Sequence, residues 1–316
     1  MLTFVPGGRS TRAPLVVVLH GCGQTAEAYA DGAGWITLAE RFGFALLCPE
    51  QTRGNNGNLC FNWFEPADVS RSGGEAASIA AMVRHAVQAN DLDGRRVFVT
   101  GLSAGGAMAA ALLATYPELF AGGAIIAGLP YGSATSMSEA FAAMHNRRPV
   151  TAKVSGDAVR AAAVPGASWP PVSIWHGEAD TVVRPGAGDA LAAQWANVHG
   201  LGGPPVRARS PAGREFQAWM SLQGEAVVEL HRIPAMGHGT PLSTSGPDGS
   251  GTAGPFLLEV GVSSSLEIAL GWGIAEMPRR TAPPGPRLQP EPKPHPGPGG
   301  VAGVIEQALR AAGLMK

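Results

Sequence analysis

RVFVTGLSAGGAMAAALLAT, residues 96–115, is the stretch that decides the fold. An apolar strand pattern at 96–100 runs into a tight turn, and a helical pattern of small residues follows at 104–115. The turn is a Gly-x-Ser-x-Gly run centred on Ser103, the setting of a nucleophile elbow. The neighbours of the serine are small, as such a strained turn requires: Gly101, Ala104 and Gly105. We therefore predict that Ser103 is a nucleophile above a sheet; a serine that caps a helix is the structural alternative.

Short apolar strands alternate with helical stretches on both sides of this turn. Strand patterns occupy residues 15–19, 44–48, 124–126, 172–175 and 227–233, the last of the series, and helical patterns occupy 35–42 and 75–89. This alternation is typical of βαβ units on a parallel sheet. We predict an α/β-hydrolase fold, with a mostly parallel, doubly wound sheet. Residues 130–170, rich in Ser, Ala, Pro and Gly, interrupt the alternation and are predicted to form a short cap over the site.

A serine hydroxyl needs a base to accept its proton, and in this fold the acid and then the base follow the serine along the chain. Asp180 comes just after the strand at 172–175, where a turn can direct its carboxylate towards a histidine. We predict Asp180 as the acid. Glu178 and Asp189 are the nearest competitors, and an aspartate that only stabilises a turn is the structural alternative.

His238 is the predicted base among the eight histidines of the chain. It follows the strand at 227–233, and Gly237 and Gly239 on either side allow a loop to reach across to the serine. His176 and His231 lie within or near strands and are expected to be structural.

An oxyanion hole is the remaining requirement, and each donor in it contributes about 3 to 4 kcal/mol to catalysis. The run HGCGQ, residues 20–24, follows the first strand pattern, in the loop expected to supply one backbone amide. We predict Cys22 as that donor and Ala104, directly after the nucleophile, as the other. His20 precedes the serine and is expected to orient the loop.

Composition and charge exclude several classes of function. The net charge is −1, so the basic surface of a nucleic-acid-binding protein and a polybasic membrane patch are both missing. No apolar run reaches the roughly 18 residues of a membrane span. No metal-spaced His/Cys cluster occurs, and we expect no metal or cofactor. The sequence begins without a signal-peptide pattern, which slightly favours a cytoplasmic location; a trimmed leader would leave secretion open.

The C-terminal part differs in composition from the rest. Residues 279–300 are dense in Pro and Gly and predict a semi-rigid linker after a catalytic domain at 1–278. Residues 301–316 show a helical pattern with one apolar face. The interpretation as a helix docking on the domain stands beside the interpretation as a tail that binds a hydrophobic partner.

Together these motifs resemble the esterase family of poly(3-hydroxybutyrate) depolymerases. The matching runs include LVVVLHGCGQ, CPEQT at 48–52, LCFNWFEP at 59–66, the stretch around Ser103 and MGHGTPL near residue 238. The resemblance covers roughly residues 14–275. It implies Ser103, Asp180 and His238 as a triad and an oxyanion hole at Cys22 and Ala104, in agreement with the choice made from the residues.

The resemblance also implies a disulfide between Cys22 and Cys60 that braces the loop at residues 20–24, called the oxyanion loop below. The alternative of three separate buried thiols is equally open if the protein stays in the cytosol, where disulfides are rare. Asn62, Trp63 and Phe64 are candidates for lining an ester or polymer groove, with core packing as the alternative for the two aromatics. Tyr131, beside the predicted cap, is a weaker candidate.

The leading hypothesis is a serine carboxylic ester hydrolase that acts through an acyl-enzyme. Its expected substrates are polyhydroxybutyrate or short-chain hydroxyalkanoate esters. Acetylated or feruloylated plant polysaccharide comes second, because related esterases share this core, and a serine peptidase third. A non-catalytic, polymer-binding homologue is the alternative from another class. The oligomeric state is not predicted.

Overall fold

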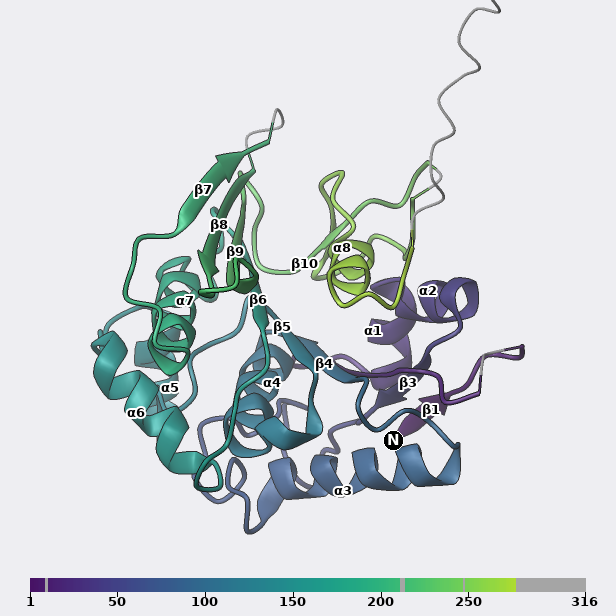
Figure 1. Ribbon diagram of the computed structural model, residues 1–316, viewed down its shortest axis with the longest axis horizontal. Helices are drawn as coiled ribbons and strands as arrows, with labels where there is room; N and C mark the ends of the chain where they lie inside the picture. The colour runs from purple at the N-terminus through teal and green to yellow at the C-terminus, as the bar shows by residue number, and fades with distance from the viewer. Residues whose placement is uncertain (9–10, 211–213, 247, 277–316) are drawn as a thin grey trace, which may run out of the picture. The chain divides into compact units, whose positions relative to one another are not determined.

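A central sheet organises the computed structural model, which describes residues 1–8, 11–210, 214–246 and 248–276. Within these ranges nine strands form one sheet in the order β1-β3-β2-β4-β5-β6-β9-β8-β7 (Figure 1). The strands are β1 Leu2–Phe4, β2 Leu15–Leu19, β3 Ala45–Cys48, β4 Val97–Leu102, β5 Gly122–Ile126, β6 Val172–Gly177, β7 Val206–Arg209, β8 Glu215–Met220 and β9 Ala226–Ile233.

The middle of this sheet is parallel, from β3 through β2, β4, β5 and β6 to β9. Parallel strands covered on both faces are apolar along their whole length, which explains the LVVVL and FALLC patterns. Every residue of β2, β3 and β4 is buried. The prediction of a mostly parallel sheet is confirmed.

Helices cover both faces of the sheet (Figure 1). The helices are α1 Ala26–Gly32, α2 Trp35–Phe42, α3 Gly74–Ala89, α4 Ala104–Thr115, α5 Met137–Met144, α6 Ala152–Ala162, α7 Gly186–Val198 and α8 Ser264–Gly271, with a 3₁₀ turn at Pro117–Leu119. One core joins the sheet to α3, α4, α6 and α7, and a second joins its other face to α1, α2 and α8. Every residue of α4 is buried. Its run of Ala and Gly is therefore a packing requirement, since it lies against the sheet and between other helices.

The antiparallel strands at the two edges of the sheet were not predicted from the sequence. β1 pairs with β3, and β8 pairs with both β7 and β9, all antiparallel. All four residues of β7 are exposed, so its sequence VRAR lacks the apolar pattern of the central strands. The prediction that 227–233 is the last strand was wrong. β10 (Thr240–Leu242) and β11 (Leu257–Glu259) follow it and pair with each other in a separate small sheet.

The segment predicted as a cap contains α5 and α6, joined by residues 145–151. The described part of the predicted catalytic domain ends at residue 276. The predicted linker at 279–300 and helix at 301–316 lie outside the described residues, so both remain predictions.

Candidate active site

Ser103 occupies a strained turn between β4 and α4. Its φ of 57° and ψ of −116° place a residue with a side chain in a backbone region that is rarely populated outside functional sites. The Ser103 amide donates to the Ile126 carbonyl at 2.9 Å, and its carbonyl accepts from the Ala107 amide at 2.9 Å. A Cβ atom at Gly105 would lie 2.3 Å from the Leu19 carbonyl oxygen, so the first turn of α4 fits against β2 only without a side chain there.

Asp180 lies in the turn after β6, with its side chain fully buried. Its Oδ1 accepts from the amides of Val182 (2.8 Å) and Val183 (2.9 Å), and its Oδ2 accepts from Nδ1 of His238 at 2.7 Å. Burial would raise the pKa of Asp180, but hydrogen bonds from His176 and His238 hold that pKa well below its usual range. The carboxylate is therefore ionised, and it fixes the orientation of the His238 ring.

The loop that carries His238 is fastened to the loop that carries Asp180. The amide of Glu178 donates to the Ile233 carbonyl and that of Ala179 to the Met236 carbonyl, both at 2.9 Å. A Cβ at Gly177 would meet the Met236 carbonyl oxygen at 2.3 Å, so the close approach of the two loops requires glycine. With Nδ1 of His238 bound to Asp180, Nε2 is the ring nitrogen left for a serine.

The two competitors for the acid are placed elsewhere. Glu178 is exposed, although it lies only two residues before Asp180. Asp189 belongs to α7 and forms an ion pair with Arg232, with 55% of its side chain exposed. Neither carboxylate has a hydrogen bond to His238 in the described part of the chain.

His176 contacts the acid as well, which the sequence analysis did not foresee. Its side chain is 1% exposed, and its Nε2 lies 2.9 Å from the Val183 carbonyl oxygen and 3.4 Å from Oδ2 of Asp180. Because a carbonyl only accepts, Nε2 carries a proton, which it directs towards both oxygens. The only signal in the sequence was the spacing of four residues, which places both side chains at the end of β6.

Two backbone amides near Ser103 have no acceptor among the described residues. In the loop after β2, Gly21, Gly23 and Gln24 each donate an amide hydrogen bond within the protein, but Cys22 does not. Ala104 is the first residue of α4, where an amide has no partner within its own helix. These are the two amides that were predicted to form the oxyanion hole.

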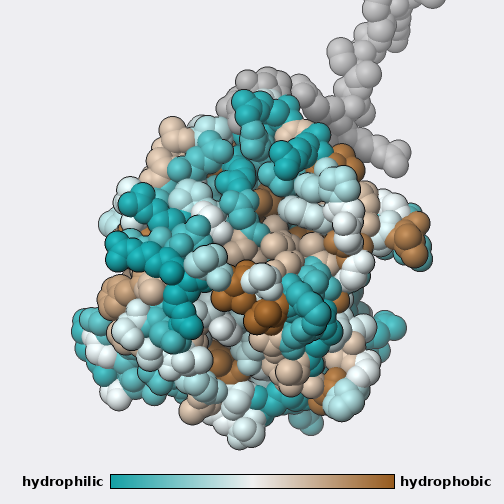
Figure 2. All heavy atoms as spheres, turned by 90° about the vertical axis from the view of Figure 1, so that its left-hand side faces the viewer, coloured by the Kyte–Doolittle hydropathy of each residue, from teal (hydrophilic) through white to brown (hydrophobic). Residues whose placement is uncertain are grey.

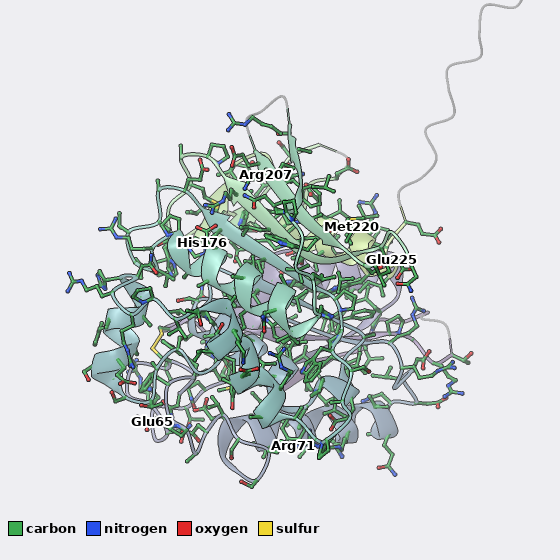
Figure 3. All side chains as sticks on the ribbon, turned by 60° about the vertical axis from the view of Figure 1, so that its left-hand side comes forward. Glu65, Arg71, His176, Arg207, Met220 and Glu225 are labelled. Carbon is green, nitrogen blue, oxygen red and sulfur yellow. A yellow bond between two sulfur atoms is a disulfide. The ribbon has the colours of Figure 1, made fainter. Side chains whose placement is uncertain are left out.

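The oxyanion loop is held by a second loop, residues 51–62. A disulfide joins Cys22 to Cys60, and the Gly23 amide donates to the Asn58 carbonyl at 3.0 Å. The disulfide is visible as a yellow bond near the left edge of Figure 3. Cys48 is a buried free thiol in β3, where burial raises its pKa to about 12.

Ser103 and His238 open into one pocket of about 300 Å³. Its walls are mainly apolar and come from the oxyanion loop, the loop 51–62, α5 and the segment before β11. The side chains with most apolar surface around it are Trp63, Phe64, Met137, Phe141, Met144, Val182 and Phe256. Phe141 is 57% exposed and Met137 46%, so the apolar surface continues out of the pocket onto α5. The side of the molecule shown in Figure 2 carries such apolar patches among hydrophilic residues.

The predicted substrate-binding residues divide into two pairs. Trp63 and Phe64 line the pocket, with their rings packed edge to face at 5.5 Å. Asn62 and Tyr131 do not line it. Asn62 is buried and bonded to Asn56 and Asp68, and the Tyr131 ring packs on the core beneath the sheet. Neither position supports the predicted role in substrate binding: the Asn62 side chain bonds neighbouring polar groups, and Tyr131 is held by Gln194 of α7 through its backbone and by the core through its ring.

Two features are absent from the described residues. These residues contain no group of three or more His, Cys, Asp or Glu side chains that could hold a metal ion. Within the same residues, no helix is both long and apolar enough to cross a bilayer.

Comparison with known sequences relates the chain to esterases. Residues 1–216 match the family model described as Esterase PHB depolymerase. The chain is 43% identical over 276 residues to poly(3-hydroxyalkanoate) depolymerase C of Paucimonas lemoignei, covering 87% of this chain and 66% of that protein. It is 32% identical over 251 residues to an acetylxylan esterase of Coprinopsis cinerea, covering 77% of this chain and 66% of that protein. The chain thus spans about two thirds of the length of both relatives.

Comparison with solved structures concerns the fold. The acetyl xylan esterase from Aspergillus awamori superposes with a TM-score of 0.72 over 86% of this chain and 93% of that chain, at 23% identity. Together with the parallel sheet covered on both faces, this likeness confirms the predicted α/β-hydrolase fold.

Proposed function

Since the chain belongs to the Esterase PHB depolymerase family, we propose that it is a serine esterase that hydrolyses polyhydroxyalkanoate or short hydroxyalkanoate esters. The observation that carries the proposal is the 2.7 Å hydrogen bond from His238 to the buried carboxylate of Asp180, at a pocket that also holds Ser103. A buried carboxylate, an oriented imidazole and a strained serine are the parts of an acyl-transfer site.

The mechanism follows from these parts. Nε2 of His238 takes the proton of the Ser103 hydroxyl as its oxygen attacks the ester carbonyl carbon. Asp180 stabilises the imidazolium that forms and keeps Nε2 directed at the serine. The tetrahedral oxyanion accepts hydrogen bonds from the amides of Cys22 and Ala104, both of which lack acceptors within the described part of the protein. The helix dipole of α4 favours the same negative charge.

Collapse of this intermediate completes the cycle. The C–O bond to the leaving alcohol breaks as His238 gives it the proton, which leaves an acyl group on Ser103. Water then loses a proton to His238 and attacks the acyl carbonyl, and the free acid departs as Ser103 recovers its proton. The protein needs no redox or metal step for this sequence.

The apolar pocket supports a hydroxyalkanoate as the acyl group. A 3-hydroxybutyryl unit carries a methyl branch and a methylene between its ester groups. The pocket walls include Trp63 and Met144, whose apolar side chains suit such hydrocarbon groups better than hydroxyl groups. Esterified polysaccharide is the second candidate, favoured by the polar side of the rim, where Gln24, Asn56 and Asn58 lie. The exposed Asn58 side chain carries an amide group that can hydrogen-bond a sugar.

Replacement of the nucleophile tests the reaction. We expect Ser103→Ala to lower kcat for p-nitrophenyl butyrate by roughly 10⁴-fold or more, because the serine and histidine act as a unit. Ser168→Ala, an exposed serine on another pocket, is the matched control and should retain full activity. A folded wild-type chain without turnover would establish a non-catalytic homologue instead.

The substrate is tested by direct competition between the two candidates. The proposed enzyme clears a suspension of polyhydroxybutyrate and releases hydroxybutyrate, and it releases little acetate or ferulate from xylan. The reverse preference would identify a polysaccharide esterase acting through the same residues.

A further inference from the structure

A buried polar network lies behind the oxyanion loop, and Glu75 of α3 is its centre. Glu75 is 9% exposed. Its Oε1 accepts from the side-chain amides of Gln51 (2.5 Å) and Asn55 (2.7 Å), and its Oε2 accepts from the backbone amide of Asn62 (2.8 Å). All three donors belong to the loop 51–62, so one carboxylate holds the beginning, middle and end of that loop.

Gln51 connects this network to the oxyanion loop. Its backbone amide donates to Nε2 of His20 at 3.1 Å, and Nδ1 of His20 donates to the Gly21 carbonyl at 2.8 Å. The His20 ring also packs against Phe61, with the ring centres 4.9 Å apart. Burial lowers the pKa of His20, which favours the neutral ring that this pair of bonds requires. Gly21 directly precedes Cys22, so Glu75 reaches the predicted oxyanion donor through two hydrogen-bonded side chains.

Asn62 connects the same carboxylate to the pocket wall. It directly precedes Trp63 and Phe64, which line the pocket. Its side chain accepts from Asn56 at 2.7 Å and donates to Asp68 at 3.1 Å, so its position depends on polar contacts alone. A shift of Asn62 would therefore move the aromatic wall.

We propose that Glu75 is a positioning residue whose ionised carboxylate holds both the Cys22 amide and the Trp63 wall in place for ester hydrolysis. The inference rests on the proposed esterase function. Both carboxylate oxygens serve only as acceptors, and each faces N–H groups. A proton on either oxygen, or an amide group in place of the carboxylate, would turn one acceptor into a donor that faces another donor.

The surroundings of Glu75 determine when it carries its charge. Burial, the largest cause, raises the pKa of Glu75 to about 7, against the hydrogen bonds from Asn62 and Gln51, which lower it. The other titratable or charged groups of the surrounding loops are Asp68, whose Oδ1 accepts from the Glu75 amide, Glu50, His20, and Arg53, which donates to the Gly57 carbonyl. None of these supplies a cation to the carboxylate, so its charge depends on neutral donors, and it is lost as the pH falls below about 7.

The test is Glu75→Gln, compared with wild type on p-nitrophenyl butyrate across the pH range. We expect kcat to fall about tenfold or more, since removal of an oxyanion donor costs roughly 10² to 10³. In wild type, the acid limb of log kcat/KM should be steeper than in the variant, because the wild-type reaction also needs ionised Glu75 and loses that charge as the pH falls below about 7. Glu267→Gln, which removes a carboxylate held by Arg214 on the opposite face of the sheet, is the control and should keep the wild-type kcat and slope.

Amide hydrogen exchange separates failure of this inference from failure of the proposed function. The backbone amides of Gln51 and Asn62 should exchange at least about tenfold faster in Glu75→Gln, while the amide of Leu191 in α7 stays protected. This readout needs no turnover. Wild-type kcat and slope in the variant, or unchanged exchange at both amides, would overturn the positioning role.

Discussion

At the scale of single residues, the site combines one strained residue with one heavily bonded residue. Ser103 keeps a positive φ, which costs about 1 to 3 kcal/mol, because the sheet and α4 hold both of its peptide groups. Asp180 accepts two backbone amides as well as His238, so its carboxylate has little freedom. These bonds fix the carboxylate that orients the His238 ring.

Asp180→Asn tests the residue that orients the base. An amide in this position can donate to Nδ1 of His238, which leaves the proton on Nε2 and removes the acceptor for Ser103. We expect kcat for p-nitrophenyl butyrate to fall by roughly 10³- to 10⁴-fold with the fold intact. Asp189→Asn is the matched control, because that carboxylate is exposed and paired with Arg232. A loss of less than tenfold in Asp180→Asn would contradict the proposed role.

At the scale of elements, the loops around the pocket depend on cross-links more than on secondary structure. The oxyanion loop after β2 and the loop 51–62 contain no helix or strand, yet the disulfide and the network of Glu75 join them. The helix α5 forms the opposite wall through Met137, Phe141 and Met144. The candidate catalytic residues therefore follow strands of the sheet, whereas the pocket walls come from loops and one short helix.

Removal of the disulfide tests this arrangement. The bond closes a loop with a sequence separation of 38, so the double variant Cys22→Ser, Cys60→Ser should lose about 3 to 4 kcal/mol of unfolding free energy through loop entropy. We also expect kcat to fall by a larger factor than KM rises, because the loop carries the predicted oxyanion donor. Urea unfolding and steady-state kinetics measure the two effects.

The control for that experiment is Cys48→Ala, which removes a buried thiol and leaves the cross-link intact. It should change kcat little. A double variant with wild-type stability and kcat would show that the hydrogen bonds alone hold the oxyanion loop.

At the scale of the whole domain, the sheet brings the site together. The loops that carry Cys22, Ser103, Asp180 and His238 follow β2, β4, β6 and β9, and these strands are parallel. Parallel strands end at the same edge, so all four loops meet there. The two cores on either face keep this edge fixed.

The buried carboxyl group of Glu75 supplies one part of the pH dependence of stability. The pKa of Glu75 is raised from 4.5 to about 7 in the folded protein, so its contribution to stability is fully present below pH 4.5. This contribution is lost as the pH rises through about 7. The carboxyl group ionises readily in the unfolded chain, whereas in the folded protein its charge must be buried. Relative to Glu75→Gln, wild type should lose up to about 3.5 kcal/mol of unfolding free energy between pH 4.5 and about pH 7, at about 1.4 kcal/mol per pH unit.

Urea unfolding of both proteins between pH 4.5 and pH 8 measures this difference, and other titrating groups cancel in the comparison. A constant difference across the range would contradict the prediction. Ionisation of Glu75 thus lowers the stability of the fold, although the ionised form is the one that the proposed positioning role requires.

The sequence by itself determined the features that depend on neighbours along the chain. The Gly-x-Ser-x-Gly turn needs small residues on both sides of Ser103, and buried parallel strands need unbroken apolar runs. Both constraints are local and steric, so they predicted the elbow, the central strands and the helix at 104–115 before any contact was known. The order of Ser103, Asp180 and His238 added the candidate site, whose catalytic roles remain predictions.

Only the tertiary structure decided which distant side chains meet. His238 reaches Asp180 across 58 positions, His176 turns out to share that carboxylate, and Glu75 bonds a loop that ends 13 positions before it. The strand β8 also depends on β9 as its partner, and the edge strand β7 in turn pairs with β8. Hydrogen bonds between side chains depend on positions in space that many packing contacts set together, and no local pattern of residues records them.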